Sequence, residues 1–361
     1  MNKLNFRILI IGNKDRFIHL EQFALELKKR GVETKIIHDL DYIDKYFELN
    51  FRKKIQKKKK FEKILQDFGP NIVLLDRITK VGQKVLENNI PIFILFRGNY
   101  WEEKKWAEKT IYKSKKQKIA VQKNEELVDY CLKNASLILP ISKYLEKEVN
   151  KRYPGKNIDF FPADGRKLDD WNGVPVQKLK HPCVGLVQGL NVWGKTRELL
   201  TLRDVLKKLP DVTFYLAGDG IYRDEIILEL EKFDNFVWMK NIDYPIEIKK
   251  FFSEIDIFLL LSGLEGLGQT IIEASLMKKP IIASNVGGIP ELIQDGENGL
   301  LVENGDANKI TEYIMKLIND PNFSETIAKT GYERIKQDFS WDKIAEKFEL
   351  ILKKHNFLKD N

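Results

Sequence analysis

Two glutamates, Glu265 and Glu273, lie in the glycine-rich segment LSGLEGLGQTIIEASL in the second half of the chain. Glu265 falls in the loop, and Glu273 falls one turn into the helix that we expect to begin near Gln269. A carboxylate accepts hydrogen bonds from two vicinal hydroxyls, as acidic groups do on a ribose or sugar ring. Chance supplies many such glutamate pairs, so an exposed loop residue and a helix-capping residue are the alternative interpretation.

The loop between the two glutamates has the composition of a phosphate-binding turn. Gly266 and Gly268 lack a Cβ, so their backbone can approach a ligand closely. The amides of Gly268, Gln269 and Thr270 would be N-terminal donors of the following helix, where an anion is favoured. We therefore expect the segment to bind a phosphorylated, hydroxyl-rich ligand.

Alternating strands and helices must position this loop. Continuous apolar runs predict strands buried in parallel sheets. The expected strands cover residues 6–11, 34–38, 72–75, 92–96 and 137–140, and then 183–188, 213–217, 256–261, 281–284 and 299–302. The expected helices cover 18–30, 197–208, 341–354 and the stretch from Gln269 to the residues before Pro280. This alternation predicts an α/β protein with two doubly wound, Rossmann-like domains, whose ligands bind at the carboxyl ends of the strands.

The irregular segment from Phe160 to Val176, rich in Gly, Pro and Asp, is the best linker. We expect one domain over 1–175 and a second over 176–340. A last helical segment, 341–361, is expected to pack back on the N-terminal domain.

Composition excludes several classes of protein. No apolar run approaches the roughly 18 residues that span a bilayer, and the opening MNKLNFRILIIGNK lacks a small-residue cleavage site, so we interpret it as a first strand. The two cysteines, Cys131 and Cys183, are too few for a disulfide framework. The four histidines show no ligand spacing, so no metal site is expected.

The net charge of +8 is unevenly distributed along the chain. Residues 1–175 hold 37 Lys/Arg against 24 Asp/Glu, whereas residues 176–361 hold 24 against 29. The tract FRKKIQKKKKF at 51–61 is either a solvated helix face or loop, or a contact with an anionic membrane. The Lys- and Trp-containing segment 101–122 would suit an amphipathic helix facing a lipid or glycan acceptor. We expect a cytoplasmic protein that contacts the inner face of the membrane peripherally.

The segment from Ile255 to Asp306 resembles the nucleotide-sugar site of the group 1 retaining glycosyltransferases, which have an E-x(7)-E motif and the GT-B fold. The family pattern is E-G-x-G, four variable residues, E-A, then P-V-I-A-S-x-x-G-G-x-x-E and D-G-x-x-G-x-L-V. The residues that match in register are Glu265, Gly266, Gly268, Glu273, Ala274, Pro280, Ala283, Gly287, Gly288, Glu291, Asp295, Gly296, Gly299 and Val302. The turn LAGDG at 216–220 and the segment ASLILPISKYLEKEV at 135–149 extend the resemblance over nearly all of 130–350.

The resemblance implies two doubly wound, Rossmann-like domains that face a central cleft: an N-terminal acceptor-binding domain and a C-terminal nucleotide-sugar-binding domain. It also implies a role for each matched residue. Glu273 would bind the ribose of the donor, while Glu265 would orient the donor sugar as a catalytic residue together with Lys195, which would steady the leaving diphosphate. The remaining donor-binding residues would be Gly266, Leu267, Gly268, Gln269, Thr270, Gly189 and Gly218.

Two departures from the family pattern concern the charged groups. Leu190 stands where the family has a diphosphate-binding arginine, so Arg197, Arg166 or Arg97 would have to replace that cation. Arg97, in FRGNYW, stands where the family has a histidine near the donor sugar. We therefore expect Arg97, Asn99 and Asn13 on the acceptor or sugar side of the site.

The expected activity is that of a retaining, metal-independent, hexosyltransferase-type enzyme, with the nucleotide-sugar as substrate and no cofactor. The triplet Asp39-Leu40-Asp41 matches a metal-binding D-x-D, but its context is wrong for one. The acceptor would be a glycan, a lipid-linked saccharide or another cell-envelope molecule. A nucleotide-sugar epimerase or hydrolase and an inactive relative are the alternatives. An oxidoreductase is disfavoured because residues 6–14 contain no G-x-G-x-x-G motif. Nucleic-acid binding is supported by the positive charge alone.

Overall fold

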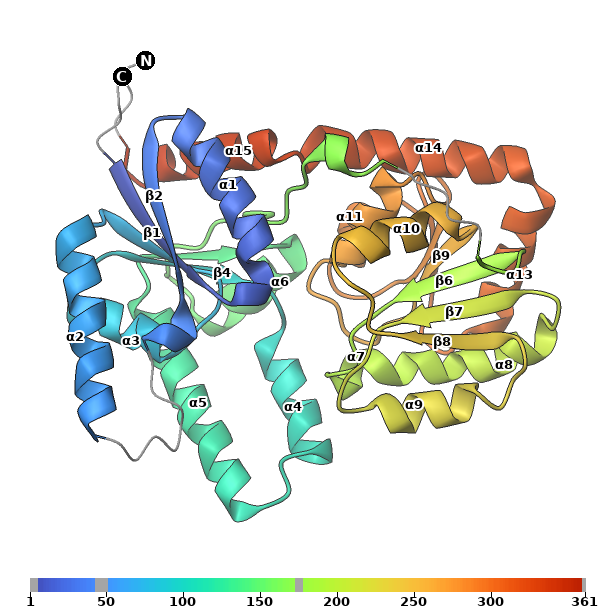
Figure 1. Cartoon of the computed structure of the whole chain (residues 1–361), viewed down its shortest axis with the longest axis horizontal. Helices are drawn as coiled ribbons and strands as arrows, with labels where there is room; N and C mark the ends of the chain where they lie inside the picture. The colour runs from blue at the N-terminus through green and yellow to red at the C-terminus, as the bar shows by residue number, and fades with distance from the viewer. Residues whose placement is uncertain (1–5, 43–50, 173–177, 359–361) are drawn as a thin grey trace. The chain divides into compact units, whose positions relative to one another are not determined.

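The computed structural model describes residues 6–42, 51–172 and 178–358, which fold into two compact units (Figure 1). We name them the N-terminal unit, formed by residues 1–97, 114–166 and 339–361, and the C-terminal unit, formed by 98–113 and 167–338. The expected boundary between residues 175 and 176 lies outside the described residues. The segment 98–113, expected in the first domain, belongs to the C-terminal unit.

Among its described residues, the N-terminal unit has a five-stranded parallel sheet in the order β2-β1-β3-β4-β5. Its strands are β1 (Phe6–Gly12), β2 (Val32–His38), β3 (Ile72–Leu75), β4 (Ile92–Phe96) and β5 (Leu137–Pro140). Its helices are α1 (Phe17–Lys29), α2 (Phe51–Phe68), α3 (Lys80–Glu87), α5 (Lys115–Asn134), α6 (Lys143–Arg152) and α15 (Trp341–Lys354). β3, β4 and β5 match the predicted ranges, because each is a short, fully buried apolar run.

The described part of the C-terminal unit has a six-stranded parallel sheet in the order β11-β10-β9-β6-β7-β8. Its strands are β6 (Cys183–Val187), β7 (Thr213–Ala217), β8 (Phe236–Lys240), β9 (Ile257–Leu260), β10 (Ile281–Ser284) and β11 (Leu300–Val302). Its helices are α4 (Tyr100–Thr110), α7 (Trp193–Thr196), the 3-10 helix η4 (Arg197–Thr201), α8 (Leu202–Lys208), α9 (Arg223–Leu230), α10 (Ile246–Glu254), α11 (Gln269–Leu276), α12 (Ile289–Leu292), α13 (Ala307–Asn319) and α14 (Pro321–Asp338). In Figure 1, α10 and α11 cover one face of this sheet, and α8 and α9 cover the other.

Several elements of the C-terminal unit differ from the prediction, and two of them have a clear physical reason. The strand β8 was not predicted, although its first four residues, Phe236 to Met239, form an apolar run; as an edge strand it keeps most of its side chains at least partly exposed. The helix expected over 197–208 is a 3-10 helix followed by α8, and the helical segment begins earlier, at Trp193.

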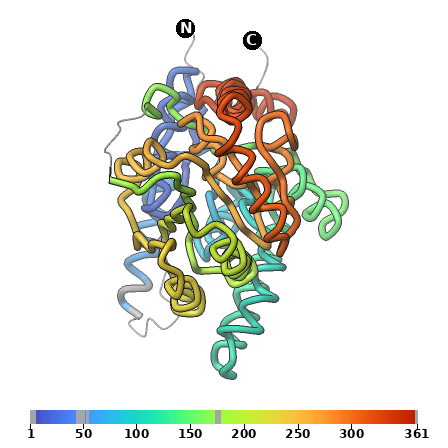
Figure 2. Tube along the Cα trace, turned by 90° about the vertical axis from the view of Figure 1, so that its right-hand side faces the viewer, coloured from blue at the N-terminus to red at the C-terminus, as the bar shows by residue number. Residues whose placement is uncertain are grey.

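The last helix, α15, packs on the first, α1, within the N-terminal unit, as Figures 1 and 2 both show. The ring of Phe23 on α1 meets Phe348 edge-on with centroids 5.4 Å apart, and Phe161 lies 5.2 Å from Phe348. Each fully buried aromatic contributes on the order of 1.5–3 kcal/mol of hydrophobic free energy. Aromatic packing thus joins the two ends of the chain in one core.

The basic tract at 51–61 lies at the start of α2. Phe61, Leu65 and Phe68 face the core, while Lys58, Lys59 and Lys60 are exposed. The segment 101–122 is divided between α4 and α5, and a capping box of Ser114 and Gln117 starts the second helix. Within the described ranges, no helix is both long and apolar enough to cross a bilayer.

Candidate active site

Loops that follow the strands of the C-terminal unit carry most of the predicted donor-binding residues. Gly189 follows β6, Gly218 follows β7, and the loop from Ser262 to Gly268 follows β9. Because these strands are parallel, their carboxyl ends meet at one edge of the sheet. The fold therefore brings residues more than 70 positions apart to the same edge.

Lys195 and Glu265 form the charged centre of this edge. The Lys195 Nζ lies 3.4 Å from Oε2 of Glu265, and the buried Ser262 hydroxyl donates to Oε1 of the same carboxylate over 3.2 Å. Both charged side chains are partly exposed, at 24% and 14%. The carboxylate is thus held at both oxygens.

A third charged group, Glu103 on α4, joins this pair electrostatically and was not predicted. Burial raises the pKa of Glu103 above its usual range; Lys195 opposes this and Glu265 adds to it. Burial alone would lower the pKa of Lys195, but Glu265 and Glu103 outweigh it, and the pKa is raised. Lys195 therefore stays charged. Glu103 comes from a part of the sequence that no motif marks.

The glycine loop is held by close backbone contacts. Gly287 has φ +58, and a Cβ there would lie 1.9 Å from the carbonyl oxygen of Glu265, so only glycine fits. The next amide, of Gly288, donates to the same oxygen over 3.3 Å. Gly266, Leu267 and Gly268 are buried beneath this contact. The motif glycines at 287 and 288 therefore fix the conformation of the loop that carries Glu265.

The helix α11 starts at Gln269, with Gly268 as its N-cap, so the positive end of its dipole points at the loop. Gln269 and Thr270 form its first turn and are partly exposed. Glu273, one turn further, is only 5% exposed, and its Oε1 accepts a hydrogen bond from the Tyr244 hydroxyl over 3.1 Å. Tyr244 is a second residue that the sequence analysis missed, because it precedes α10 and meets Glu273 only in the fold.

Two buried residues, Gln188 and Leu190, follow the end of β6 beside the glycine loop's edge of the sheet. Leu190 is fully buried, so it belongs to the core and supplies no charge. Gln188 is 8% exposed, and neither polar atom of its side chain has a hydrogen-bond partner among the described residues. Such a buried amide is costly unless a ligand or water satisfies it. Gln188 is therefore a candidate donor-binding residue that no motif indicated.

The region containing this geometry matches a known family. Residues 194–334 match the family model described as "Glycosyl transferases group 1". The chain carries a group 1 glycosyltransferase domain. The matched region includes Lys195, Glu265 and Glu273.

Curated relatives are similar over part of the chain. An uncharacterised glycosyltransferase of Methanocaldococcus jannaschii is 30% identical over 228 residues, which cover 59% of this chain and 58% of that protein. The capsular polysaccharide biosynthesis glycosyltransferase CapM of Staphylococcus aureus is 35% identical over 123 residues, 33% of this chain and 32% of that protein. The chain thus spans just over half of the first relative and about a third of the second.

Solved structures show the fold of the whole chain. Sucrose-phosphate synthase of Thermosynechococcus elongatus matches with a TM-score of 0.77 and 19% identity, over 97% of this chain and 99% of that one. Anabaena HepE, in complex with UDP and glucose, matches with a TM-score of 0.73 and 15% identity, over 96% and 99%. The chain therefore has the GT-B fold, as the sequence predicted.

The three residues expected on the acceptor side have other partners. Arg97, which follows β4, donates to Asp76 and Asp164 over 2.7 Å each. Asn99 is buried, and its side chain accepts the Glu102 amide as the N-cap of α4. Asn13, after β1, donates to Asp15 over 2.9 Å. Whether any of them meets a substrate stays a prediction.

Arg97 belongs to a buried charge cluster in the N-terminal unit. Arg16 also contacts Asp164, over 2.7 Å, and Arg166 donates to the carbonyls of Asp164 and Gly165. Burial would raise the pKa of Asp164, but Arg97 and Arg16 hold it well below its usual range. Of the cations considered as replacements at Leu190, Arg97 and Arg166 are thus engaged within this cluster. Arg197 is engaged too, since it pairs with Glu198 over 3.2 Å.

The fold brings together one set of side chains with metal-ligating atoms, although the sequence spacing did not predict it. The ligating atoms of His181, Cys183 and Asp256 all lie within 4.8 Å of one another, near the amino ends of β6 and β9. His181 Nδ1 and the Cys183 amide both lie against Oδ2 of Asp256, at 2.8 and 2.7 Å. Burial, helped by Asp256, raises the pKa of the Cys183 thiol to about 12. This group lies at the opposite edge of the sheet from Lys195.

Proposed function

We propose that this protein is a retaining glycosyltransferase that moves a sugar from a nucleotide-sugar to a glycan, lipid-linked saccharide or other cell-envelope acceptor, without a metal. The observation that carries the proposal is the pairing of Lys195 with Glu265 over 3.4 Å beside a glycine loop that opens α11. A cation, a carboxylate held at both oxygens and a helix N-terminus at the same edge of the sheet suit a sugar diphosphate.

Each residue then has a role toward the donor. Glu273 accepts hydrogen bonds from the ribose hydroxyls, while the Tyr244 hydroxyl holds its other oxygen. The start of α11 and the Lys195 ammonium face the diphosphate. Glu265, held by Ser262, orients the sugar through its hydroxyls.

In the reaction, the bond between C1 and the diphosphate oxygen breaks, and its electron pair stays on that oxygen. Lys195 stabilises the negative charge that develops there. The acceptor hydroxyl forms the new bond to C1 on the same face, and its proton passes to the departing phosphate oxygen. Configuration at C1 is thereby retained.

The names of similar proteins support the donor and acceptor classes. The HepE structure holds UDP and glucose, and the CapM relative is named for capsular polysaccharide biosynthesis. A lipopolysaccharide core biosynthesis glycosyltransferase of Rhizobium meliloti is 27% identical over 196 residues. On this basis we place the acceptor among cell-envelope saccharides.

A thermal-shift panel with UDP, GDP, ADP, CMP and NAD tests the donor site. A ligand at 100 times its dissociation constant stabilises the folded state by about 2.7 kcal/mol. We expect one nucleoside diphosphate to raise the melting temperature and Glu273→Gln to abolish the rise. Glu254→Gln, on α10 at the other edge of the sheet, is the matched control. If none of the five nucleotides stabilised the protein, the proposal would be contradicted.

Two further measurements test the finer parts of the proposal. The anomeric configuration of the product, measured by NMR coupling constants, distinguishes retention from inversion. Turnover in excess EDTA should equal turnover without it. An inverted product or loss of activity in EDTA would overturn the corresponding part.

The alternative of an epimerase or hydrolase would be favoured by a carboxylate and histidine base in the N-terminal unit. The fold does bring His19 near Asp164, but burial and the neighbouring Arg166 and Arg16 lower the pKa of His19 to about 2. Asp164 is held by Arg16 and Arg97. These groups suit a structural cluster better than an acid and a base.

A peripheral contact with anionic membrane is the last part of the proposal. The exposed lysines of α2, Lys58, Lys59 and Lys60, are its candidate surface. Sedimentation with phosphatidylglycerol vesicles should show binding at low salt that is lost at high salt, because such contacts are screened. Absence of binding at low salt would contradict this part.

A further inference from the structure

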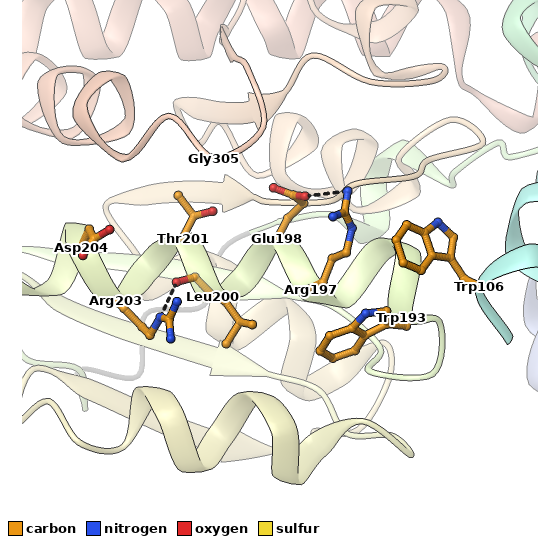
Figure 3. A pocket seen from close by; sticks show the side chains of 9 residues that line it. All are labelled: Trp106, Trp193, Arg197, Glu198, Leu200, Thr201, Arg203, Asp204 and Gly305. Carbon is orange, nitrogen blue, oxygen red and sulfur yellow. Dashed lines mark hydrogen bonds and ion pairs between the residues drawn. The ribbon is translucent and has the colours of Figure 1, made fainter. Parts of the chain in front are cut away.

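A pocket beside the candidate active site has a lining that neither the family motifs nor the proposed donor roles use. It has a volume of about 460 Å³, and all of its lining belongs to the C-terminal unit. We name it the tryptophan pocket; its lining residues are Trp106, Trp193, Arg197, Glu198, Leu200, Thr201, Arg203, Asp204 and Gly305. Figure 3 shows both indoles at one end, Arg203 and Asp204 at the other, and Gly305 opposite the helical segment.

The aromatic end of the pocket is fixed by packing. Trp106 on α4 lies so close to α7 that a Cβ on Gly194 would come within 2.5 Å of its ring. The Arg197 guanidinium lies 4.8 Å from the Trp106 ring centroid, and Trp193 packs on Tyr222 with centroids 5.3 Å apart. Both indoles remain partly exposed. Rigid, partly exposed indoles offer flat apolar surfaces with a polar N–H at the edge.

The pocket lining contains two positively and two negatively charged side chains, so its net charge is zero. Arg197 pairs with Glu198 over 3.2 Å, and Arg203 pairs with Glu229 over 3.6 Å. Asp204 and the Thr201 hydroxyl add further acceptors and a donor. An anionic ligand would have to compete with carboxylates that already hold both arginines. A neutral ligand with many hydroxyls, by contrast, can donate to the carboxylates and accept from the guanidinium groups.

One polar atom in the lining is unsatisfied. The Nε of Arg197 is buried and has no hydrogen-bond partner among the described residues. Glu198, beside it, is only 8% exposed. Buried polar atoms of this kind usually have a partner, which points to a ligand or water at this end.

The pocket and the Lys195–Glu265 pair share one chain segment. Lys195 is two residues before Arg197, and its carbonyl accepts the Gly263 amide over 3.3 Å. The Glu198 side chain lies directly against Gly263, two residues before Glu265. A molecule held in the pocket is therefore adjacent to the segment that carries the reacting donor.

We propose that the tryptophan pocket binds a neutral sugar residue of the acceptor, away from its reacting hydroxyl. The apolar face of a pyranose would lie on the exposed indole surface, and its hydroxyls would meet Arg197, Glu198 and Asp204. The proposal rests on the proposed transferase function and makes the acceptor a saccharide of at least two residues.

Saturation-transfer NMR on the full chain tests the proposal without turnover. The neutral probes are maltose, cellobiose, lactose and chitobiose, and the anionic probes are glucuronic acid and glucose 6-phosphate. We expect at least one neutral disaccharide to bind, and to bind more strongly than either anionic probe. Arg197→Ala should weaken that binding at least about fivefold, the loss expected for a hydrogen bond or two. Thr201→Trp, which fills the pocket, should abolish it.

The matched control is Arg223→Ala, because Arg223 also lies over an indole, that of Trp238 at 5.7 Å, but outside the pocket. It should leave disaccharide binding unchanged, and all three variants should retain nucleoside diphosphate binding. The proposal is overturned if no neutral disaccharide binds, if the pocket variants bind as the wild type does, or if the anionic probes bind better. If the wild type bound no nucleoside diphosphate, the transferase function would be contradicted. The disaccharide measurements would then still show whether the tryptophan pocket binds a neutral sugar.

Discussion

The hydroxyl of Tyr244 donates a hydrogen bond to Oε1 of Glu273 over 3.1 Å. Glu273 is buried on α11, whereas Tyr244 is 40% exposed before α10. A carboxylate fixed at one oxygen keeps the other in a constant orientation for a ligand. The tyrosine is therefore a positioning residue for the carboxylate that we propose binds the ribose.

Replacing Tyr244 with phenylalanine removes this hydrogen bond and little else. One hydrogen bond to a charged group contributes on the order of 1.5 kcal/mol, so nucleotide affinity should fall about tenfold. Titration calorimetry with the nucleoside diphosphate measures the change. Tyr215→Phe, which removes a hydroxyl that accepts from the Lys180 amide, should leave the affinity as it is.

Lys195→Met tests whether the ammonium acts mainly on the developing charge. Loss of such a group typically lowers turnover about 100- to 1000-fold. Nucleotide affinity should fall much less, so kcat should decrease strongly while the dissociation constant for the nucleotide changes little. Lys309→Met, an exposed lysine on α13, is the control. Equal losses in turnover and affinity would mean that Lys195 only binds the donor.

Gln188→Met should separate stability from binding. The buried amide of Gln188 has no hydrogen-bond partner among the described residues, and its removal should raise the free energy of unfolding by about 1 kcal/mol. The same change should weaken nucleotide binding if the amide serves the donor. Urea denaturation and calorimetry give the two quantities. A more stable variant with unchanged affinity would remove Gln188 from the site.

Arg97→Ala should destabilise the N-terminal unit strongly. It removes one of the two arginines that pair with the buried Asp76 and Asp164, and loss of one partner of a buried ion pair typically costs about 3–5 kcal/mol. Arg30→Ala also removes two ion pairs of this unit, with Asp342 and Glu349, but these lie nearer the surface and should cost no more than about 1 kcal/mol. Urea denaturation of both variants gives the comparison. Similar losses would mean that the Arg97 cluster is not the stabilising feature.

His19 predicts how stability depends on pH. Burial, with Arg166 and Arg16, lowers the pKa of His19 from 6.5 to about 2. At pH values between these two, His19 is protonated in the unfolded state but neutral in the folded state. Stability should therefore fall as pH drops below about 6.5, by up to about 1.4 kcal/mol per pH unit. Denaturation between pH 7 and 5 should show a flatter dependence in His19→Gln. Trp341→Phe, which alters the ring packed near His19, should lower stability without changing the slope.

The sequence predicted the elements and residues that depend on local patterns. Short apolar runs predicted β3, β4 and β5, and the motif around Glu265 and Glu273 indicated the family. Glu103 and Tyr244 were missed because each meets its partner, Lys195 or Glu273, only through the fold, across 92 and 29 positions respectively. The same holds for Arg97, whose partners Asp76 and Asp164 lie 21 and 67 positions away. Local periodicity carries no information on such pairs.

The C-terminal unit takes α4 from the middle of the sequence that otherwise builds its neighbour. That helix carries Glu103 and Trp106, so residues 167–338 alone would lack one wall of the tryptophan pocket and one charge of the active site. Neither unit is therefore formed by one continuous segment of the sequence. Replacing residues 1–166 as one block would therefore also replace α4, and with it Glu103 and Trp106 of the C-terminal unit.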